Sequence, residues 1–425
     1  MRSFRSLAAT IAVAAVLTLA GCSDKARPES TPTPAASEVP PALQRILTDV
    51  ATIRQLSPPP TLNAQLIARS DLPALLDRLL TDEDRKDFRD RTTLYRLLGH
   101  LRNDQDMYSV YRAFGGDAVL GLYSPVGGEL WIVHDDGQTI DFDHLPPEEK
   151  STLAHEMVHA IQDYHFHLDD VYHRVVSDID VSLAWTCVVE GDAMANEALY
   201  TNNHTMAVGS GRVYLLGAST TAADVPPSIA REFLFPYLTG TDWLKGVRAN
   251  GGTAAVNTMI TDPPKGSAYV LHPELQSTGW QPSAVTLPDL SGALGAGWAR
   301  ESGGAFGEFQ LRNYLQLRLR ATDAVTAATG WAGDHYDVYT AGNESVAAFR
   351  VQFRDAAEAA EFAGAQERFL QAAGAKVTTE ADTRLAATPD GNVTATTAAS
   401  GDQVVFVIGS NRDVAARALA VLIHG

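Results

Sequence analysis

Five consecutive residues, His155-Glu156-Met157-Val158-His159, combine two imidazoles and a carboxylate at helical spacing. Histidines four positions apart lie on one face of a helix, with their Cβ atoms roughly 5–6 Å apart. Both rings can then reach one zinc ion at about 2.0–2.1 Å. Glu156 is rotated one residue around the helix, where it can take a proton from zinc-bound water. The pattern therefore predicts a metal, a nucleophile and a general base in one place, which is typical of zinc hydrolases and most often of peptidases.

A helix must position this motif. Residues 145–150, Leu-Pro-Pro-Glu-Glu-Lys, have the features of a helix start, with proline in the first turn and acidic residues at the positive end of the dipole. On a helical wheel the two histidines lie opposite an apolar stripe, which consists of Leu153, Met157, Ala160, Ile161 and Tyr164. We therefore expect an amphipathic helix whose histidines face a cleft.

The third ligand determines the type of zinc site, and Glu190 is the first candidate. It lies in a stretch from about residue 180 to 200 that is predicted to be a second helix. Its neighbours on the same helical face are Leu183, Cys187 and Met194. A carboxylate on an apolar stripe costs several kcal/mol unless it is paired or bound to a metal. Zinc at the two histidines would satisfy it.

His165 is the alternative third ligand. It stands where peptidases with a His-Glu-x-x-His-x-x-Gly-x-x-His pattern place their third histidine. That pattern needs glycine at position 162 to turn the chain, and Gln162 stands there instead. The residues favour Glu190 over His165. A buried acid paired with an arginine is the remaining interpretation of Glu190.

Residues 155–163 and 189–193 resemble bacterial secreted or lipoprotein zinc metallopeptidases of the gluzincin type. Weaker matches extend the resemblance over most of the chain from about residue 46, and they lie at residues 104–107, 119–123, 263–274 and 330–334. The resemblance implies a zincin-like fold, with Glu190 as the third zinc ligand and Glu156 as the catalytic base.

One segment departs from the family pattern. Where the family tends to have Ser-Thr-Glu-Gln before Leu-His-Pro, this chain has Gly266-Ser267-Ala268-Tyr269. A glutamate that handles substrate would then be missing, and specificity or activity would change with it.

Three further residues are candidates for supporting roles. His272 and Tyr269 could each donate a hydrogen bond to the oxyanion of the reaction, although a lone loop histidine is more often structural. Asp163 could hold the zinc ligands in place by hydrogen bonding.

The N-terminus carries the second strong signal. Arg2 and Arg5 precede an apolar run that ends in Leu19-Ala20-Gly21-Cys22. A basic start, a short apolar core and small residues before the cleavage point are typical of a secretory signal peptide rather than a membrane span. The ending resembles a bacterial lipobox, which implies cleavage before Cys22 and a lipid on its sulfur. We expect an extracytoplasmic protein anchored to the bacterial cell membrane. An ordinary signal peptide with an incidental cysteine is the alternative.

The segment after the signal peptide, residues 22–41, is rich in proline, serine, threonine and alanine, which predicts a disordered tether. The chain has 2 cysteines, Cys22 and Cys187, so lipidation of the first leaves no internal disulfide. Cys187 could supply a thiolate ligand, but a buried free cysteine usually behaves as a small hydrophobe.

The charge balance bears on partners. Lys and Arg total 33 against 51 Asp and Glu, for a formal net charge of −18. Such acidity argues against a nucleic-acid partner, because phosphate contacts need basic patches. It also argues against electrostatic adsorption to anionic lipid, so membrane attachment would depend on the lipid anchor. Charge does not indicate the substrate.

The rest of the chain predicts an α+β fold class. Residues 42–330 should form the zincin-like metallopeptidase domain, mainly helical with a small sheet. Within it, residues 41–112 should be helical and residues 119–133 should form a β-hairpin, whose edge could hold an extended peptide unless it is covered. Residues 331–425 should form a small α+β unit of ferredoxin-like type, with strands near 345–353 and 404–408 and helices near 356–373 and 413–423.

Together these patterns predict a membrane-anchored peptidase with one Zn²⁺ ion and a peptide or protein substrate. The ion would polarise water and the scissile carbonyl, while Glu156 would deprotonate the water and pass the proton to the leaving amine. The alternative is a non-catalytic surface lipoprotein, with a structural zinc or a degenerate peptidase site. The intact Glu156 argues against it, because a structural site has no use for a base.

Overall fold

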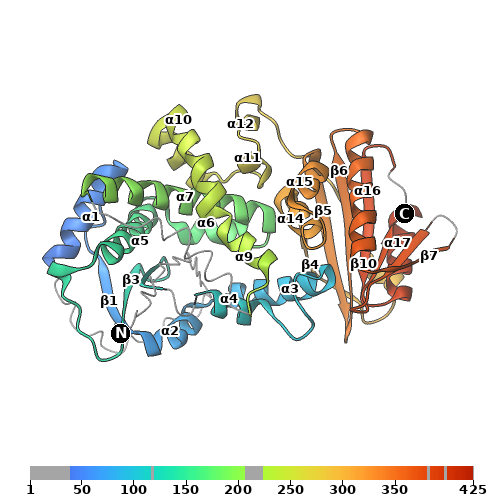
Figure 1. The fold of residues 1–425 in the computed structure, drawn as a ribbon, viewed down its shortest axis with the longest axis horizontal. Coiled ribbons are helices and arrows are strands. Elements are labelled where there is room, and N and C mark those ends of the chain that lie inside the picture. Colours follow the sequence, from blue (N-terminus) through green and yellow to red (C-terminus); the bar gives the residue numbers. More distant parts are fainter. Residues whose placement is uncertain (1–38, 116–118, 206–223, 381–382, 397–399, 425) are drawn as a thin grey trace, which may run out of the picture.

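A computed structural model describes residues 39–115, 119–205, 224–380, 383–396 and 400–424. The described chain is mixed α and β, as expected. In Figure 1 a helical N-terminal region lies on one side and a large C-terminal sheet on the other. The signal peptide, Cys22 and most of the expected tether lie outside the described residues. Within those residues, every helix is too short or too polar to cross a membrane.

The N-terminal region is mainly helical. Its helices are α1 (Pro41–Arg54), α2 (Leu72–Leu79), α3 (Asp82–Leu98), α4 (Met107–Gly115), α5 (Pro147–Phe166), α6 (Leu168–Val175), α7 (Ile179–Asn203), α9 (Pro227–Leu234) and α10 (Thr241–Thr261). Shorter segments are the 3₁₀ turns η1 (Arg69–Asp71) and η2 (Phe142–His144), the π-helical turn η3 (Pro236–Gly240), α11 (Ala268–Leu271) and α12 (Leu275–Thr278). Most residues of helix α7 are buried, and it contacts α1, α5, α6, α10 and η3, so it forms the centre of this region.

The two helices that carry the candidate ligands, α5 and α7, each begin with a recognisable helix-start feature. Helix α5 has Pro147 in its first turn, together with Glu148 and Glu149. Helix α7 is capped by the Asp178 side chain, which accepts hydrogen bonds from the amides of residues 180 and 181. Each feature satisfies or complements the unpaired amides of a helix start.

A small sheet packs against these helices in the order β1-β3-β2. Strands β2 (Gly121–Ser124) and β3 (Glu129–His134) form the predicted hairpin. Strand β1 (Asn63–Ala68) pairs with β3 in parallel and corrects the expectation of continuous helix over residues 41–112. Polar and apolar residues alternate over only four positions, Asn-Ala-Gln-Leu, and burial does not alternate, so the strand depends on pairing with β3 rather than on a strong local pattern.

The C-terminal sheet has seven antiparallel strands in the order β4-β5-β6-β10-β9-β8-β7. The strands are β4 (Ala299–Gly304), β5 (Trp331–Ala341), β6 (Glu344–Phe353), β7 (Lys376–Glu380), β8 (Thr383–Ala387), β9 (Val393–Thr396) and β10 (Gln403–Gly409). One face packs against α14 (Gly307–Leu315), α15 (Ala321–Ala328) and α16 (Ala356–Ala372). The other packs against α13 (Ser291–Leu294) and α17 (Arg412–His424).

This sheet is larger than the ferredoxin-like unit expected for residues 331–425. An α+β fold of that type gathers its helices on one face of the sheet, whereas helices cover both faces here. The cause lies in the central strands, whose successive side chains point to opposite faces of the sheet and are apolar on both faces. Phe349 and Phe406 face one core, and Ala348 and Val407 face the other. The sheet also begins at Ala299, before residue 331.

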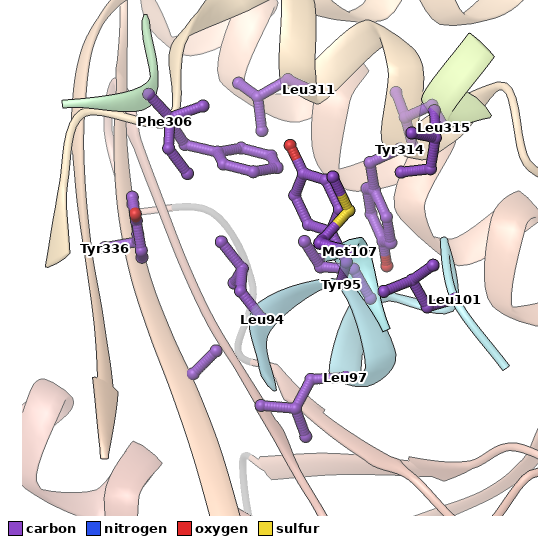
Figure 2. Packing of buried hydrophobic residues seen from close by; sticks show 14 of the residues in the cluster. Leu94, Tyr95, Leu97, Leu101, Met107, Phe306, Leu311, Tyr314, Leu315 and Tyr336 are labelled. Carbon is purple, nitrogen blue, oxygen red and sulfur yellow. The ribbon is translucent and has the colours of Figure 1, made fainter. Parts of the chain in front are cut away.

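One hydrophobic core joins the two regions. Figure 2 shows Leu94, Tyr95 and Leu97 of α3 in one cluster with Leu311 and Tyr314 of α14 and Tyr336 of β5. All of these side chains are buried. The core therefore crosses the boundary expected at residue 330.

Candidate metal centre

His155, His159 and Glu190 come together in the structure. One ligand atom from each lies within 4.8 Å of the others. The His155 Nε2 atom is 3.2 Å from Glu190 Oε2 and 3.1 Å from His159 Nε2, and His159 Nε2 is 3.6 Å from Glu190 Oε2. Atoms bound tetrahedrally to zinc at about 2.0–2.1 Å are about 3.3–3.4 Å apart. The donor types and their spacing therefore fit one zinc ion.

The cluster lies between α5 and α7 and is more deeply buried than the sequence suggests. His155 and Glu190 are 0% exposed and His159 is 1% exposed. Because α7 packs along the histidine face of α5, residues 151–162 of α5 are buried on all sides. The expected amphipathic helix facing a cleft is therefore not observed, and Tyr164, placed on the packed stripe, is 47% exposed.

Close helix packing holds Glu190 in place. The π-helical turn η3 lies against α7 at Gly191 and Gly240. A Cβ atom on Gly191 would lie 3.0 Å from the Gly240 carbonyl oxygen, and one on Gly240 would lie 2.8 Å from Cys187 Cβ. Only glycine allows this approach. Cys187 is accordingly a buried free thiol packed between these elements, as the hydrophobic interpretation predicts.

Each histidine has an orienting partner on its other ring nitrogen. The His155 Nδ1 atom is 3.2 Å from Glu197 Oε2, and Glu197 also accepts a hydrogen bond from the Ser151 hydroxyl. The His159 Nδ1 atom is 2.9 Å from Gln162 Oε1. A metal bound through both Nε2 atoms requires the ring protons on Nδ1, where Glu197 and Gln162 would accept them.

A second layer of buried polar groups extends from Gln162 to helix α1. The Gln162 amide donates to Asp192 at 2.9 Å, and Arg54 Nε donates to the same carboxylate at 2.6 Å. Arg54 is 0% exposed, and its Nη2 donates to Asn257 at 2.6 Å. This chain of contacts connects α1 to the side chain of His159.

Glu156 lies beside the cluster with one carboxylate oxygen engaged. Its Oε2 accepts a hydrogen bond from the backbone amide of Tyr123 at 2.8 Å. Its Oε1 is buried and has no hydrogen-bond partner among the described residues. Burial raises the pKa of Glu156, against the opposing effect of the nearby histidines. A carboxylate with a raised pKa and one unengaged oxygen is suited to accept a proton.

The pKa of Glu190 shifts the other way. Burial acts to raise it, but hydrogen bonds from His155 and His159 outweigh burial and lower the pKa to about 2. Glu190 is therefore an anion, the form in which a carboxylate binds a metal. The pKa values of the two acids thus shift in opposite directions, because the histidines outweigh burial at Glu190, whereas burial outweighs the histidines and the Tyr123 amide at Glu156.

The other sequence candidates lie elsewhere. His165 Nε2 is 2.8 Å from the Ser57 carbonyl oxygen, on the loop after α1. His272 Nε2 is 2.9 Å from Glu308 Oε1, and the Tyr269 hydroxyl donates to the Trp280 carbonyl. The cluster thus contains Glu190 rather than His165, and the departure at residues 268–269 concerns a different part of the fold.

Asp163 acts on the hairpin rather than on the cluster. Its Oδ2 accepts a hydrogen bond from the Tyr123 hydroxyl at 2.8 Å, and its Oδ1 accepts one from the Leu168 amide at 3.0 Å. Because the Tyr123 amide holds Glu156, Asp163 and Glu156 fix the same residue of β2 from two sides. All four residues of β2 are buried, so the edge beside α5 is covered.

Sequence reasoning missed Glu197, Asp192 and Arg54. Glu197 follows Glu190 by seven residues, which places both on one side of α7 and would have indicated it. Asp192 and Arg54 carry no such signal, because their pairing joins positions 138 residues apart.

Comparison with known families gives one match, to a domain of unknown function, DUF8575, over residues 297–419. This range runs from just before β4 into α17, so it corresponds to the C-terminal sheet and its helices. The metal cluster lies outside it. Comparisons with curated proteins and with solved structures yield no match.

Proposed function

We propose that this protein is a zinc-dependent peptidase. The observation that carries the proposal is the buried Oε1 of Glu156, which has no hydrogen-bond partner in the described part of the chain and lies beside the His155–His159–Glu190 set. Three protein ligands are typical of catalytic zinc sites, whereas structural sites usually have four. The motif containing Glu156 supports peptide hydrolysis as the reaction.

The residues divide the chemistry among them. A zinc ion bound there would supply Lewis acidity to polarise a carbonyl and activate water. Glu156 Oε1 accepts the proton of the attacking water and later delivers it to the leaving nitrogen. The Tyr123 amide holds the other carboxylate oxygen in place during both transfers. Glu197 and Gln162 keep the histidine rings oriented.

One observation favours a second candidate, a non-catalytic lipoprotein with a structural metal. The cluster is at most 1% exposed, and the β2 edge that could pair with a peptide is covered. In this candidate the metal would only join α5 to α7. The Oε1 atom of Glu156, which has no hydrogen-bond partner among the described residues, then has no role, and for this reason we place the peptidase first.

Membrane attachment through Cys22 belongs to the same proposal, since peptidase and anchor together suggest an extracytoplasmic enzyme. Fractionation of cells expressing the parent and Cys22→Ser tests it. We expect Cys22→Ser to leave the membrane fraction or to keep its signal peptide. A correctly cleaved Cys22→Ser protein that stays membrane-bound would contradict the anchor.

Metal analysis combined with digestion of a peptide library tests the reaction. We expect one zinc per chain, cleavage by the zinc-loaded protein, loss of cleavage after chelation and recovery after zinc is restored. Zinc binding without cleavage of any library member would contradict the peptidase and support the structural metal.

A further inference from the structure

A pocket of about 190 Å³ lies next to Glu190. Its walls come from α3, α4, α7 and the α9–η3 segment. Along α7 the lining residues are Ser182, Leu183 and Thr186, followed by Glu190 itself. From residue 182 to residue 190 the helix rises about 12 Å. The pocket therefore extends along α7 and ends at one of the candidate metal ligands.

The walls of the pocket are largely apolar. The apolar lining residues are Phe88, Met107, Phe114, Leu183, Phe233 and Pro236. Two of them, Phe114 and Phe233, form an edge contact with ring centroids 4.8 Å apart. An apolar cavity of about 150 Å³ is large enough to hold benzene. The pocket can therefore accommodate a phenyl ring or a branched aliphatic side chain.

The charged groups in the lining disfavour an ionic occupant. Arg91 donates to Asp87 at 3.0 Å and to Glu232 at 2.7 Å, so its charge is already neutralised. Glu232 also accepts a hydrogen bond from the Tyr95 hydroxyl at 2.7 Å. An acidic side chain would meet Asp87, Glu190 and Glu232 without a free cation in this lining. A basic one would lose water against apolar walls, beside carboxylates that already have partners.

We infer that this pocket binds the large apolar side chain, aromatic or branched aliphatic, of a substrate residue next to the scissile peptide bond. The inference rests on the proposed peptidase function and adds the class of substrate. Thr186 lines the pocket one turn before Glu190 and is partly exposed, so a larger side chain at this position would occupy pocket space.

A binding experiment tests the pocket without relying on catalysis. We would titrate N-acetyl-phenylalanine amide into the full-length protein, with and without zinc, by isothermal titration calorimetry. Burial of a phenyl ring corresponds to about 10- to 100-fold in affinity. We therefore expect N-acetyl-phenylalanine amide to bind at least about tenfold tighter than the N-acetyl-lysine and N-acetyl-glutamate amides.

Two variants and a control locate that binding. Thr186→Trp fills the pocket and should weaken the phenylalanine probe by about tenfold or more. Ala198→Trp, on an exposed position of the same helix, should leave the affinity unchanged. Phe233→Ala enlarges the pocket and should shift preference from the phenylalanine to the tryptophan amide, which keeps the test open if Thr186→Trp does not fold.

Cleavage of the peptide library separates this inference from the proposed function. Cleavage next to large apolar residues would support both the peptidase function and the pocket, provided that Thr186→Trp loses this cleavage while its zinc content stays unchanged. Cleavage without that preference, or equal effects of Thr186→Trp and Ala198→Trp, would overturn the pocket and leave the peptidase standing. Selective probe binding without any cleavage would support the pocket and overturn the peptidase.

Discussion

Both regions of this molecule have apolar cores, but only the N-terminal one also buries a cluster of candidate metal ligands among the described residues. Between α5 and α7 the interior holds His155, His159, Glu156, Glu190 and a surrounding layer of polar groups. The C-terminal sheet instead packs aromatic rings, with Phe349 and Phe406 stacked at 4.5 Å between centroids. Burying polar and charged groups costs free energy unless each is paired, whereas burying rings stabilises the fold.

This difference separates the residues that could bind a metal from the residues that mainly stabilise the fold. The N-terminal interior holds the candidate metal ligands, and its polar groups form hydrogen bonds with one another. The C-terminal sheet has no comparable cluster among the described residues. The sheet shares one hydrophobic core with α14 and α3 (Figure 2). Because α3 belongs to the N-terminal region, this core stabilises the region that carries the site. Substitutions should therefore separate metal binding from stability.

The largest expected effect is loss of the metal. Changing His155, His159 or Glu190 to alanine should abolish stoichiometric zinc binding and lower the melting temperature in excess zinc, since a ligand that binds only the folded state stabilises it. His165→Ala is the matched control and should retain zinc, because His165 contacts the loop after α1. Equilibrium dialysis with elemental analysis measures both. Zinc loss in His165→Ala with retention in Glu190→Ala would reverse the assignment.

The next effect concerns the buried layer behind His159. Arg54→Met leaves the Asp192 carboxylate buried without its cation, at a cost of about 3–5 kcal/mol in the free energy of unfolding. Zinc affinity should also fall, by about 10- to 100-fold, because Asp192 holds the Gln162 side chain that orients His159.

Arg45→Met, also on α1, is the control for Arg54→Met. Its ion pair with Asp143 joins side chains that are 65% and 72% exposed, so it should change stability by at most about 1 kcal/mol and leave zinc affinity unchanged. Urea unfolding and zinc competition titration measure the two quantities. If Arg54→Met destabilises the fold with unaltered zinc affinity, Arg54 supports only the helix packing.

A smaller effect appears in the pH dependence. Burial, with a contribution from Arg231, lowers the pKa of His100 to about 3. The unfolded chain binds that proton near pH 6.5, so unfolding takes up a proton between pH 6.5 and 3. His100 therefore reduces the free energy of unfolding as pH falls below 6.5, by up to about 1.4 kcal/mol per pH unit.

His100→Phe isolates this contribution, because phenylalanine has no titratable group but keeps a ring beside Tyr95. In the parent the centroids of the His100 and Tyr95 rings are 5.0 Å apart. The variant should equal the parent near pH 8 and exceed it by about 2 kcal/mol at pH 5. Urea unfolding at both pH values measures this. A constant difference between the two proteins over this range would contradict the assignment.

The smallest effect is confined to the C-terminal core. Phe349→Leu removes part of the stack with Phe406 and should cost about 1–2 kcal/mol, with zinc affinity unchanged. Val377→Ala, at a strand position 42% exposed, should stay within about 0.5 kcal/mol. Loss of zinc in Phe349→Leu would show that the two interiors are coupled rather than separate.

Local sequence patterns predicted several of the elements around this site. The histidine spacing and the proline and acidic residues before it located α5, and a carboxylate on an apolar stripe selected Glu190 over His165. The hairpin of β2 and β3 and the terminal helix α17 were likewise visible as short-range patterns. In each case the informative residues lie within a few turns of one another.

Features set by long-range pairing were not predictable. Strand β1 alternates over only four residues and depends on β3, more than 60 positions away in the sequence. The contact of Arg54 with Asp192 joins α1 to α7, and the covered edge of β2 results from how α5 packs. The extent of the C-terminal sheet depends on β4, whose short Gly-containing sequence is unlike a typical strand.

The most direct test of the central claim is a single substitution, Glu156→Gln, assayed for zinc content, melting temperature and peptide hydrolysis. Glutamine keeps the size and the hydrogen bond from the Tyr123 amide but cannot accept the proton. We predict full zinc content, an unchanged melting temperature and hydrolysis reduced on the order of 10²–10⁴-fold. Glu148→Gln, exposed on the same helix, should behave as the parent. Hydrolysis by Glu156→Gln at the parent rate would contradict the account.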